Sequence, residues 1–484
     1  MTTAPSTDTA PAANAPIDPQ LRRTAAAIIT GAVTVVLDTT IVSVGLDRLG
    51  HALHAPVSTI QWVSTAYLLA MFVSIPLSGW LQGRLGSKRL WLASLTVFLL
   101  GSGLCALAWN APSLIAFRAL QGLGGGVMMP LMATILMQAA HGRNLGRLMA
   151  AVSLPAAVGP ILGPVVGGLI LNDLSWRWLF LVNLPIGAVG LVLAVRLIPA
   201  GEPGRRVPLD LVGLLLLSPG VVGVIFGLSR VGNAGGFVHA EVLAPLVAGL
   251  GLVAAFIAWA LRRGERALID IQLFRHRALA MSSLLIFLTG VALYGAMLLL
   301  PLYWQQVRGE DALGAGLLLA PQGVGALASR TIAGRLTDSI GGRWVATVGF
   351  ALMAIATVPF ALATSTTRTW WLMAVLVVRG LAVGAVFIPL MTGAYLGLER
   401  SEVPDASIVT RIAQQLGGSF GVAVLAVILV NATAASRGAN RLSVGFDHAF
   451  WWATGFTTVA AVLSLLLPKK PTAARSSPGA GVET

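Results

Sequence analysis

Residues 34–46 read T-V-V-L-D-T-T-I-V-S-V-G-L and place one carboxylate, Asp38, within an apolar run from Thr24 to Leu46. A run of this length and hydropathy crosses the hydrocarbon core of a bilayer as a helix. A charged side chain at that depth costs about 2.5 kcal/mol or more unless it is paired, protonated or in contact with water. The stretch therefore indicates a membrane-spanning helix and marks Asp38 as a candidate functional residue.

The composition of the chain is that of a membrane protein. Of its 484 residues, 56% are hydrophobic and only 10% are charged, whereas a soluble domain carries about 25% charged residues. Residues 1–20 and 469–484 lack apolar runs, and we expect both to be disordered cytoplasmic tails, the first of them not a signal peptide. Cys105 is the single cysteine, which excludes an intramolecular disulfide and a cysteine-based zinc site.

Fourteen apolar stretches are long enough to be membrane helices. They are 24–46, 60–81, 90–109, 113–139, 147–171, 178–199, 209–229, 240–261, 278–304, 312–333, 344–364, 370–397, 405–431 and 448–468. Lys and Arg concentrate in the loops and tails on the side of both termini. The opposite loops carry only Arg48, Arg177, Arg230, Arg308, Arg368, Arg437 and Arg441. This asymmetry predicts that both termini are cytoplasmic. The net charge of +14 then reflects topology, and we expect no nucleic acid partner.

Two parts of the chain repeat each other. G-W-L-Q-G-R-L-G-S-K-R at 79–89 reappears as G-R-L-T-D-S-I-G-G-R at 334–343, and F-R-A-L-Q-G-L-G-G-G-V-M-M-P-L-M at 117–132 as V-R-G-L-A-V-G-A-V-F-I-P-L-M at 378–391. Eight predicted helices separate the members of each pair, so an inserted pair lies between two six-helix halves. Repeats with a site at their interface are the architecture of secondary transporters. The predicted domains are tails at 1–20 and 469–484, six-helix bundles at 21–200 and 266–468, and two inserted, peripheral helices at 201–265.

Several motifs make the chain resemble a known family. L-D-T-T-I-V-S-V begins at Leu37, R-A-L-Q-G at Arg118, G-P-I-L-G-P-V-V-G-G at Gly159 and W-R-W-L-F-L-V-N-L-P-I-G at Trp176. In this order they resemble the major facilitator superfamily, in its fourteen-helix drug:proton antiporter branch typified by EmrB and QacA. L-D-L-V-G-L-L-L-L (209–217) and L-I-D-I-Q-L-F-R-H-R (268–277) resemble segments of that branch's inserted pair. The resemblance implies an all-α polytopic membrane protein with the major facilitator fold: two pseudo-symmetric six-helix bundles plus two inserted helices, 14 transmembrane helices in all.

Asp38 and Arg118 are the candidates for proton coupling. A partly buried carboxylate binds and releases a proton near neutral pH, as a proton-driven cycle requires. Arginine stays charged and needs an acceptor. The resemblance assigns R-A-L-Q-G to proton transfer, so we expect Arg118 to bond a deprotonated acceptor, with Asp38 as the candidate, and to release it on protonation. The alternative is that each side chain only braces neighbouring helices.

The fifth predicted helix carries a repeat of glycine and proline. Glycines every four residues give a smooth face for close packing, and prolines bend the helix. The resemblance takes this repeat as the signature of exporters, and we expect it to pack against a helix of the other half and to seal one side of the cavity. The residues assigned to this gate are Gly159, Pro160, Gly163, Pro164, Gly167 and Gly168.

The loop at 79–89 and its second copy resemble the cytoplasmic latch of the superfamily. Gly83 stands where the family has an acid, whereas the second copy keeps Asp338. We therefore expect the first-half latch to be weaker or to use another partner. The latch residues are Gly79, Arg84, Gly86, Asp338, Gly341 and Arg343.

The charges inside the helices bear on the substrate. Asp38 is the only acid that we place deep in the bilayer, and the arginines in or near helices are Arg118, Arg330, Arg379 and Arg411. We therefore expect neutral, zwitterionic or anionic amphiphiles rather than dications. Methionine and aromatic side chains suit tolerant binding, although the same side chains also pack helices. The candidates for the cavity lining are Gln121, Met128, Met132, Tyr294, Trp304, Arg379 and Arg411.

These patterns predict a proton-driven exporter of lipophilic or amphiphilic small molecules that works by alternating access, with multidrug efflux as the first hypothesis. A dedicated exporter of one endogenous lipid, antibiotic or metabolite fits the same motifs. A membrane-embedded enzyme or a sensor is the remote alternative, because all six histidines fall in loops or at helix ends and no G-x-x-x-x-G-K-[ST] motif occurs. We expect a monomer in the bacterial inner membrane with no metal and no cofactor beyond the proton gradient. A periplasmic adaptor stays open as a partner.

Overall fold

The computed structural model describes residues 18–140, 163, 166–199, 208–234, 236–364, 366–399, 401–436 and 441–468. Every regular element within these ranges is a helix. Ten of the described helices are long and apolar enough to cross a membrane, or eleven if the bent pair α3 (Val57–Ser74) and α4 (Leu77–Leu85) is one span. The chain is therefore a multi-pass, all-α membrane protein. The predicted stretch 147–171 lies mostly outside the described residues, and each of the other predicted stretches coincides with a helix or with the bent pair.

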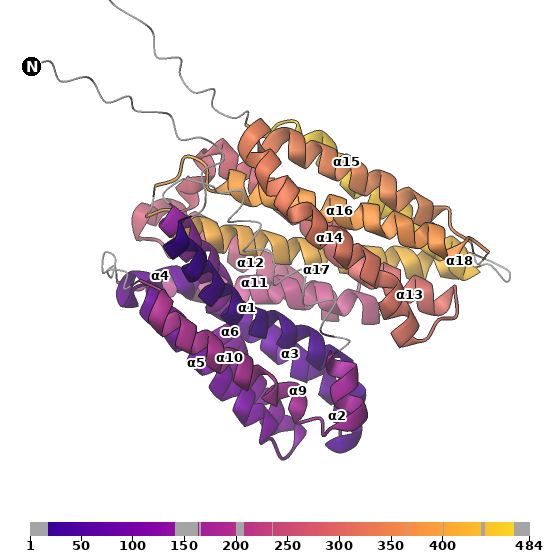
Figure 1. The fold of residues 1–484 in the computed structure, drawn as a ribbon, viewed down its shortest axis with the longest axis horizontal. Helices are drawn as coiled ribbons and strands as arrows, with labels where there is room; N and C mark the ends of the chain where they lie inside the picture. The colour runs from indigo at the N-terminus through magenta and orange to yellow at the C-terminus, as the bar shows by residue number, and fades with distance from the viewer. Residues whose placement is uncertain are drawn as a thin grey trace, which may run out of the picture.

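The helices before the inserted pair form one bundle, drawn from indigo to magenta in Figure 1. They are α1 (Pro19–Val44), α2 (Leu46–Ala52), α3 (Val57–Ser74), α4 (Leu77–Leu85), α5 (Ser87–Ala106), α6 (Ala111–Ala140), α9 (Trp178–Leu181) and α10 (Asn183–Leu197). α1 begins at a side-chain cap, since the Asp18 carboxylate accepts from the N–H of Gln20 at 3.0 Å. The helix axis bends by 57° between α3 and α4, at Pro76, whose ring nitrogen has no N–H to donate to a helical hydrogen bond.

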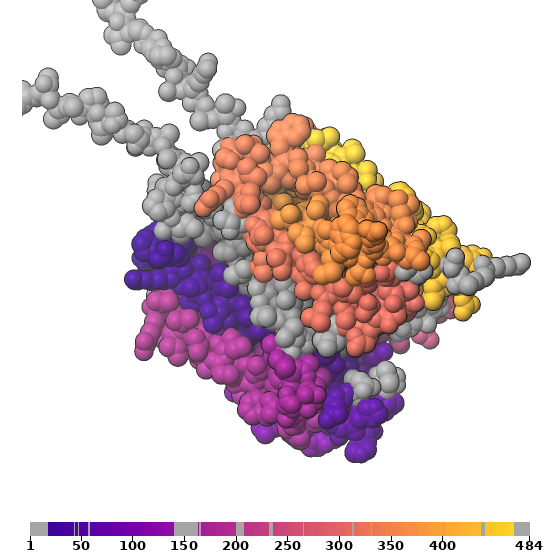
Figure 2. Space-filling view, turned by 45° about the vertical axis from the view of Figure 1, so that its right-hand side comes forward, coloured from indigo at the N-terminus to yellow at the C-terminus, as the bar shows by residue number. Residues whose placement is uncertain are grey.

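The helices after the inserted pair form a second bundle, whose colour runs through orange to yellow in Figure 1. In the space-filling view its atoms occupy a different side of the molecule from those of the first bundle (Figure 2). The inserted pair is α11 (Leu211–Ala234) and α12 (Ala240–Arg263), followed by the short helices η1 (Gly264–Arg266) and η2 (Ile271–Arg275). The second bundle consists of α13 (Arg277–Gln306), α14 (Ala312–Ile340), α15 (Gly342–Ala361), α16 (Thr369–Ala394), α17 (Val403–Ala435) and α18 (Arg441–Ser464).

The two latch sequences fold into the same turn. α4 ends and α5 begins at Gly86, with φ 78° and ψ 157°, and α14 meets α15 at Gly341, with φ 92° and ψ 152°. A side chain with a Cβ rarely adopts a positive φ of this size, so glycine is required at both junctions. The internal repeat seen in the sequence therefore extends to backbone geometry.

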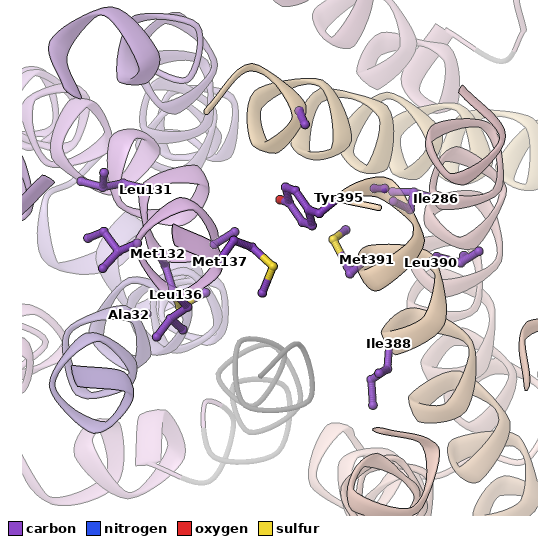
Figure 3. Packing of buried hydrophobic residues seen from close by; sticks show 14 of the residues in the cluster. Ala32, Leu131, Met132, Leu136, Met137, Ile286, Ile388, Leu390, Met391 and Tyr395 are labelled. Atoms are coloured by element: carbon purple, nitrogen blue, oxygen red, sulfur yellow. The ribbon is translucent and has the colours of Figure 1, made fainter. Parts of the chain in front are cut away.

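The two bundles pack against each other at one end of the molecule. We call the end where α1 begins and α18 ends the terminal end, and the other end the distal end. At the terminal end one apolar cluster contains side chains of both bundles, and Met137 of α6 points toward Met391 and Tyr395 across the interface (Figure 3). At the distal end the described apolar side chains form two separate clusters, one in each bundle. The structure is therefore closed at the terminal end.

The inserted pair bridges the two bundles. Figure 1 shows α11 and α12 between them, and α11 packs against both α3 and α17. The Ser218 hydroxyl of α11 donates to the carbonyl of Val73 at 3.2 Å. Apolar side chains of the pair share one cluster with Phe72 of the first bundle and Ile408 of the second. The sequence predicts a peripheral position for the pair, and the structure adds that α11 contacts both halves of the repeat.

Asp210 anchors the inserted pair at the terminal end. Its carboxylate accepts from the indole N–H of Trp259 at 3.0 and 3.1 Å and from the backbone N–H of Leu268 at 3.1 Å. It also accepts from the N–H of Gly213 at 3.0 Å, in the first turn of α11. One carboxylate thus joins α11, α12 and the segment that leads into the second bundle.

Candidate functional site

Asp38 lies at the centre of a buried polar cluster in the first bundle. Its side chain has no exposed surface, and three side chains from two other helices donate to it. Arg118 Nη1 of α6 lies 2.5 Å from Oδ2. Gln121 Nε2, one turn further along α6, and Asn183 Nδ2 of α10 donate to Oδ1 at 2.9 and 2.8 Å. The carboxylate therefore has charge-assisted hydrogen bonds at both oxygens, which stabilise its ionised form.

Arg118 is held from several sides as well. Its side chain is 1% exposed, and Nη1 also donates to Gln121 Oε1 at 2.7 Å. Nε donates to the carbonyl of Val63 in α3 at 3.2 Å, and the guanidinium carbon lies 4.0 Å from the ring centroid of Tyr67. A buried guanidinium needs such acceptors because it keeps its charge at every relevant pH. The Asp38–Arg118 pair is thus compensated in charge and linked to α3.

Further polar groups extend the cluster toward α5 and α9. Asn183 Nδ2 lies 3.1 Å from the Ser102 hydroxyl, which donates to the carbonyl of Phe180 at 2.9 Å. The Cys105 thiol donates weakly to Gln121 Oε1 at 3.8 Å. The cluster around Asp38 therefore links α1 to α6 and α10 directly, and to α3, α5 and α9 through the partners of Asp38.

Glycines allow these helices to approach each other. A Cβ at Gly122 would strike the carbonyl of Tyr67 in α3, and a Cβ at Gly101 of α5 would lie 2.7 Å from Cα of Gln121. Because real Cβ contacts are never that short, α6 sits against both neighbours through glycine. This close packing sets the distance at which Arg118 and Gln121 reach across to Asp38.

The sequence predicted part of this cluster. It selected Asp38 and Arg118, which the structure brings into contact, and it placed Gln121 among cavity candidates although that side chain is fully buried beside Asp38. Asn183 and Tyr67 were missed. The sequence signal that could have identified Asn183 is its place as the single asparagine in the largely apolar stretch W-R-W-L-F-L-V-N-L-P-I-G.

Comparison with known proteins gives the family. The sequence of residues 28–422 matches the Major Facilitator Superfamily. The chain belongs to this superfamily. It is accordingly a membrane transporter and not an enzyme, and the resemblance drawn from its motifs is confirmed.

Relatives within the superfamily have names that refer to drug export. The chain is 37% identical over 415 residues to the multidrug resistance protein B homolog of Mycobacterium tuberculosis, covering 85% of this chain and 77% of that protein. It is 31% identical over 398 residues to the multidrug export protein EmrB of Haemophilus influenzae, with coverages of 82% and 78%. The proton:xylose symporter XylE shares the fold, with a TM-score of 0.67, 15% identity and coverages of 93% and 96%.

The second bundle of this transporter holds a buried arginine at the position that matches Arg118. Arg379 of α16 occupies the repeat position of Arg118 and is 3% exposed. It donates to Gln322 Oε1 at 2.7 Å, to the carbonyl of Ala292 at 3.3 Å and to the Thr357 hydroxyl at 3.4 Å. Within the described part of the chain, the groups that accept from Arg379 are all neutral. The two matching arginines therefore differ in their partners, since Arg118 is paired with a carboxylate.

An acid from the second bundle lies beside the first latch. A Cβ at Gly79 would lie 3.4 Å from Oδ1 of Asp405, in the first turn of α17. The other oxygen of Asp405 accepts from the N–H of Asp270 at 3.0 Å. Close by, Gln82 Nε2 donates to the Ser87 hydroxyl at 2.8 Å and to Gln138 at 3.2 Å. Asp405 thus brings a carboxylate to the loop that lacks one at position 83.

The remaining latch side chains lie at the two loops. The guanidinium carbon of Arg84 is 5.4 Å from the Trp80 ring, and that of Arg343 is 5.8 Å from the Trp344 ring. Arg84 is exposed, whereas Asp338 is half-buried.

Two of the three described glycines of the fifth predicted helix face α1. A Cβ at Gly163 would strike Thr40, and one at Gly167 would lie 3.3 Å from the carbonyl of Ile41. The expected packing against the other half is therefore wrong for these two positions, because α1 belongs to the same half. Gly168 has open space around its Cβ position. Gly159, Pro160 and Pro164 lie outside the described residues.

The cavity candidates have different environments. Met128 and Met132 are buried in the apolar cluster that joins the bundles. Trp304 has no exposed surface and packs against Tyr303, with ring centroids 5.6 Å apart. In this conformation it offers no surface to a ligand. Tyr294 and Arg411 are half-buried, in contrast.

Proposed function

We propose that this transporter is a proton-coupled exporter of lipophilic or amphiphilic small molecules that works by alternating access and serves in multidrug efflux. The observation that carries the proposal is Asp38, a fully buried carboxylate bonded to Arg118, Gln121 and Asn183. The names of the relatives support drug-like substrates. The charge pattern of the loops supports cytoplasmic termini, which makes the terminal end the cytoplasmic end.

In the proposed cycle, protonation of Asp38 removes the charge that holds Arg118. Arg118 Nη1 lies 2.5 Å from Asp38 Oδ2 in this structure, a distance that suits an ion pair with an ionised carboxylate. A neutral carboxyl group binds a cation more weakly, so Arg118 is released to its other acceptors and the contacts of α6 with α1 change. Each proton supplies about 1.4 kcal/mol per pH unit and about 2.3 kcal/mol per 100 mV of membrane potential. These free energies are of the size needed to shift the equilibrium between two conformations.

The place of Asp38 along α1 suits proton uptake from outside. Asp38 lies six positions before Val44, the distal end of α1, and nineteen positions after Pro19, its terminal end. The bundles are joined by apolar packing at the terminal end and have separate clusters at the distal end. In the proposed orientation this is an outward-facing arrangement, in which a proton reaches Asp38 from the periplasmic side after substrate has left.

The proposal is tested by transport in proteoliposomes across an imposed pH gradient, with lipophilic dyes as substrates. Wild-type protein and the Asp38→Asn variant are compared at equal incorporation, with Asp173→Asn as a matched control at an exposed position near the distal end. We expect wild type and control to move dye only with a gradient, and Asp38→Asn to bind dye without gradient-driven transport. Normal coupling in Asp38→Asn would show that Asp38 is only a brace.

A further inference from the structure

Arg411 stands on the face of α17 that meets the first bundle. One turn before it, the hydroxyl of Ser407 lies 3.0 Å from that of Thr134 in α6. Residues four apart share one face of a helix, and four residues advance about 6 Å along the axis. Arg411 therefore follows the Ser407–Thr134 contact on the same face, one turn further from the terminal end.

The guanidinium of Arg411 has few partners in the described residues. Nη1 donates to Gln414 Oε1 of its own helix at 3.1 Å. Nε is buried and, across the described ranges, has no acceptor. By contrast, Arg118 is bonded to three residues and Arg379 to three others. Since a guanidinium carries five N–H donors and keeps its charge, Arg411 retains donors for another acceptor.

Among the described residues, Arg411 forms no ion pair with an acid. Asp38, the acid that the sequence places deep in the bilayer, is engaged by Arg118, Gln121 and Asn183. Residues 141–162, which the structure does not describe, contain no Asp or Glu in their sequence. A charge held at this depth without a counter-ion is costly, so a ligand that brings a negative group lowers the free energy of the site.

An aromatic ring lies further along the same face. Gly418 follows Arg411 by seven residues, two helical turns, and a Cβ there would lie 2.6 Å from the ring of Tyr294 in α13. Tyr294 is half-buried, so part of its ring is open to contact. A cation and a flat ring about 10 Å apart along a helix suit a molecule with one anionic group and an apolar aromatic body.

We propose that Arg411 binds the anionic group of an amphiphilic substrate, a sulfonate or carboxylate, and thereby selects anionic over neutral molecules of the same shape. This inference rests on the proposed function and names the substrate class of the exporter. Arg411 acts by direct charge-assisted hydrogen bonds to the substrate.

The test is equilibrium binding in lipid nanodiscs at one fixed pH without a gradient, with empty nanodiscs subtracted. The probes are 1-anilinonaphthalene-8-sulfonate and its neutral counterpart N-phenyl-1-naphthylamine, which share a skeleton and differ in a sulfonate that stays ionised. The variants are Arg411→Gln and Arg411→Lys, with Arg441→Gln as the control at an exposed position. Binding of the neutral probe reports on folding in every sample.

We expect Arg411→Gln to weaken sulfonate binding at least tenfold while the neutral probe stays within twofold of wild type. Arg411→Lys keeps the charge but loses the planar fork, so its loss is intermediate, and Arg441→Gln matches wild type. Equal changes for both probes in Arg411→Gln, or no sulfonate binding by wild type, would overturn the proposal. Because no gradient is used, the outcome is separate from that of the Asp38→Asn transport experiment.

Discussion

Replacement of Asn183 by alanine tests whether the hydrogen bonds around Asp38 support gradient-driven transport. Asn183 Nδ2 lies 2.8 Å from the carboxylate and 3.1 Å from the Ser102 hydroxyl, and the whole side chain is buried. A hydrogen bond to a charged group contributes about 1.5 to 3 kcal/mol. Its loss disfavours the ionised carboxylate by that amount, while the bonds from Arg118 and Gln121 remain.

Since about 1.4 kcal/mol is a factor of ten in an equilibrium constant, this loss corresponds to a factor of about ten to a hundred in the balance between two conformations. We therefore expect gradient-driven transport by Asn183→Ala to be slower than wild type by about tenfold or more, while equilibrium dye binding stays within twofold. The assay is dye transport in proteoliposomes at equal incorporation, with the same pH difference for every variant. Asn172→Ala, at an exposed position, is the matched control and keeps the wild-type rate.

A wild-type rate in Asn183→Ala would contradict a role of this hydrogen bond in the transport cycle. Loss of dye binding together with transport would show that Asn183 only supports the packing of α10.

Three further predictions follow from packing. Gly122→Ala, whose Cβ would strike α3, lowers the free energy of unfolding by about 1 to 3 kcal/mol and so lowers the melting temperature in detergent, whereas Gly103→Ala, with nothing within 4 Å of its Cβ position, does not. Equal melting temperatures of the two variants would contradict the close approach of α6 to α3. In the double variant Thr134→Cys, Ser407→Cys, whose wild-type hydroxyls are 3.0 Å apart, we expect a disulfide that stops transport until a reductant is added. Full activity of the oxidised protein would show that this contact persists throughout the cycle. Asp210→Ala removes the hydrogen bonds that join α11, α12 and the following segment, so we expect it to destabilise the protein by at least about 1.5 kcal/mol and to lower the melting temperature by a few degrees. An unchanged melting temperature would show that the inserted pair is held by apolar packing alone.

The features that could be predicted from the sequence are those that depend on short stretches of chain. Membrane helices follow from local hydropathy, and the superfamily follows from motifs in a fixed order. Asp38 and Arg118 could be selected because an ionisable residue within an apolar run is costly wherever the helix packs. Their mutual contact was a hypothesis, since charge and depth limit the possible partners without identifying one.

The partners themselves are decided by how the helices are rotated and how closely they approach. Asn183 and Tyr67 reach the Asp38 site because α10 and α3 turn those faces inward, and Gln121 joins it because Gly101 and Gly122 let α6 sit close to its neighbours.

The same dependence explains the expectations that changed. Gly163 and Gly167 present a smooth face in any arrangement, and only the packed structure shows that α1 lies against it. Asp405 reaches the first latch from a helix more than 300 positions later in the chain. A membrane helix is apolar around most of its circumference because lipid and neighbouring helices are both apolar surroundings. Its sequence therefore specifies that it spans the bilayer, and contacts with distant parts of the chain decide which side chains meet.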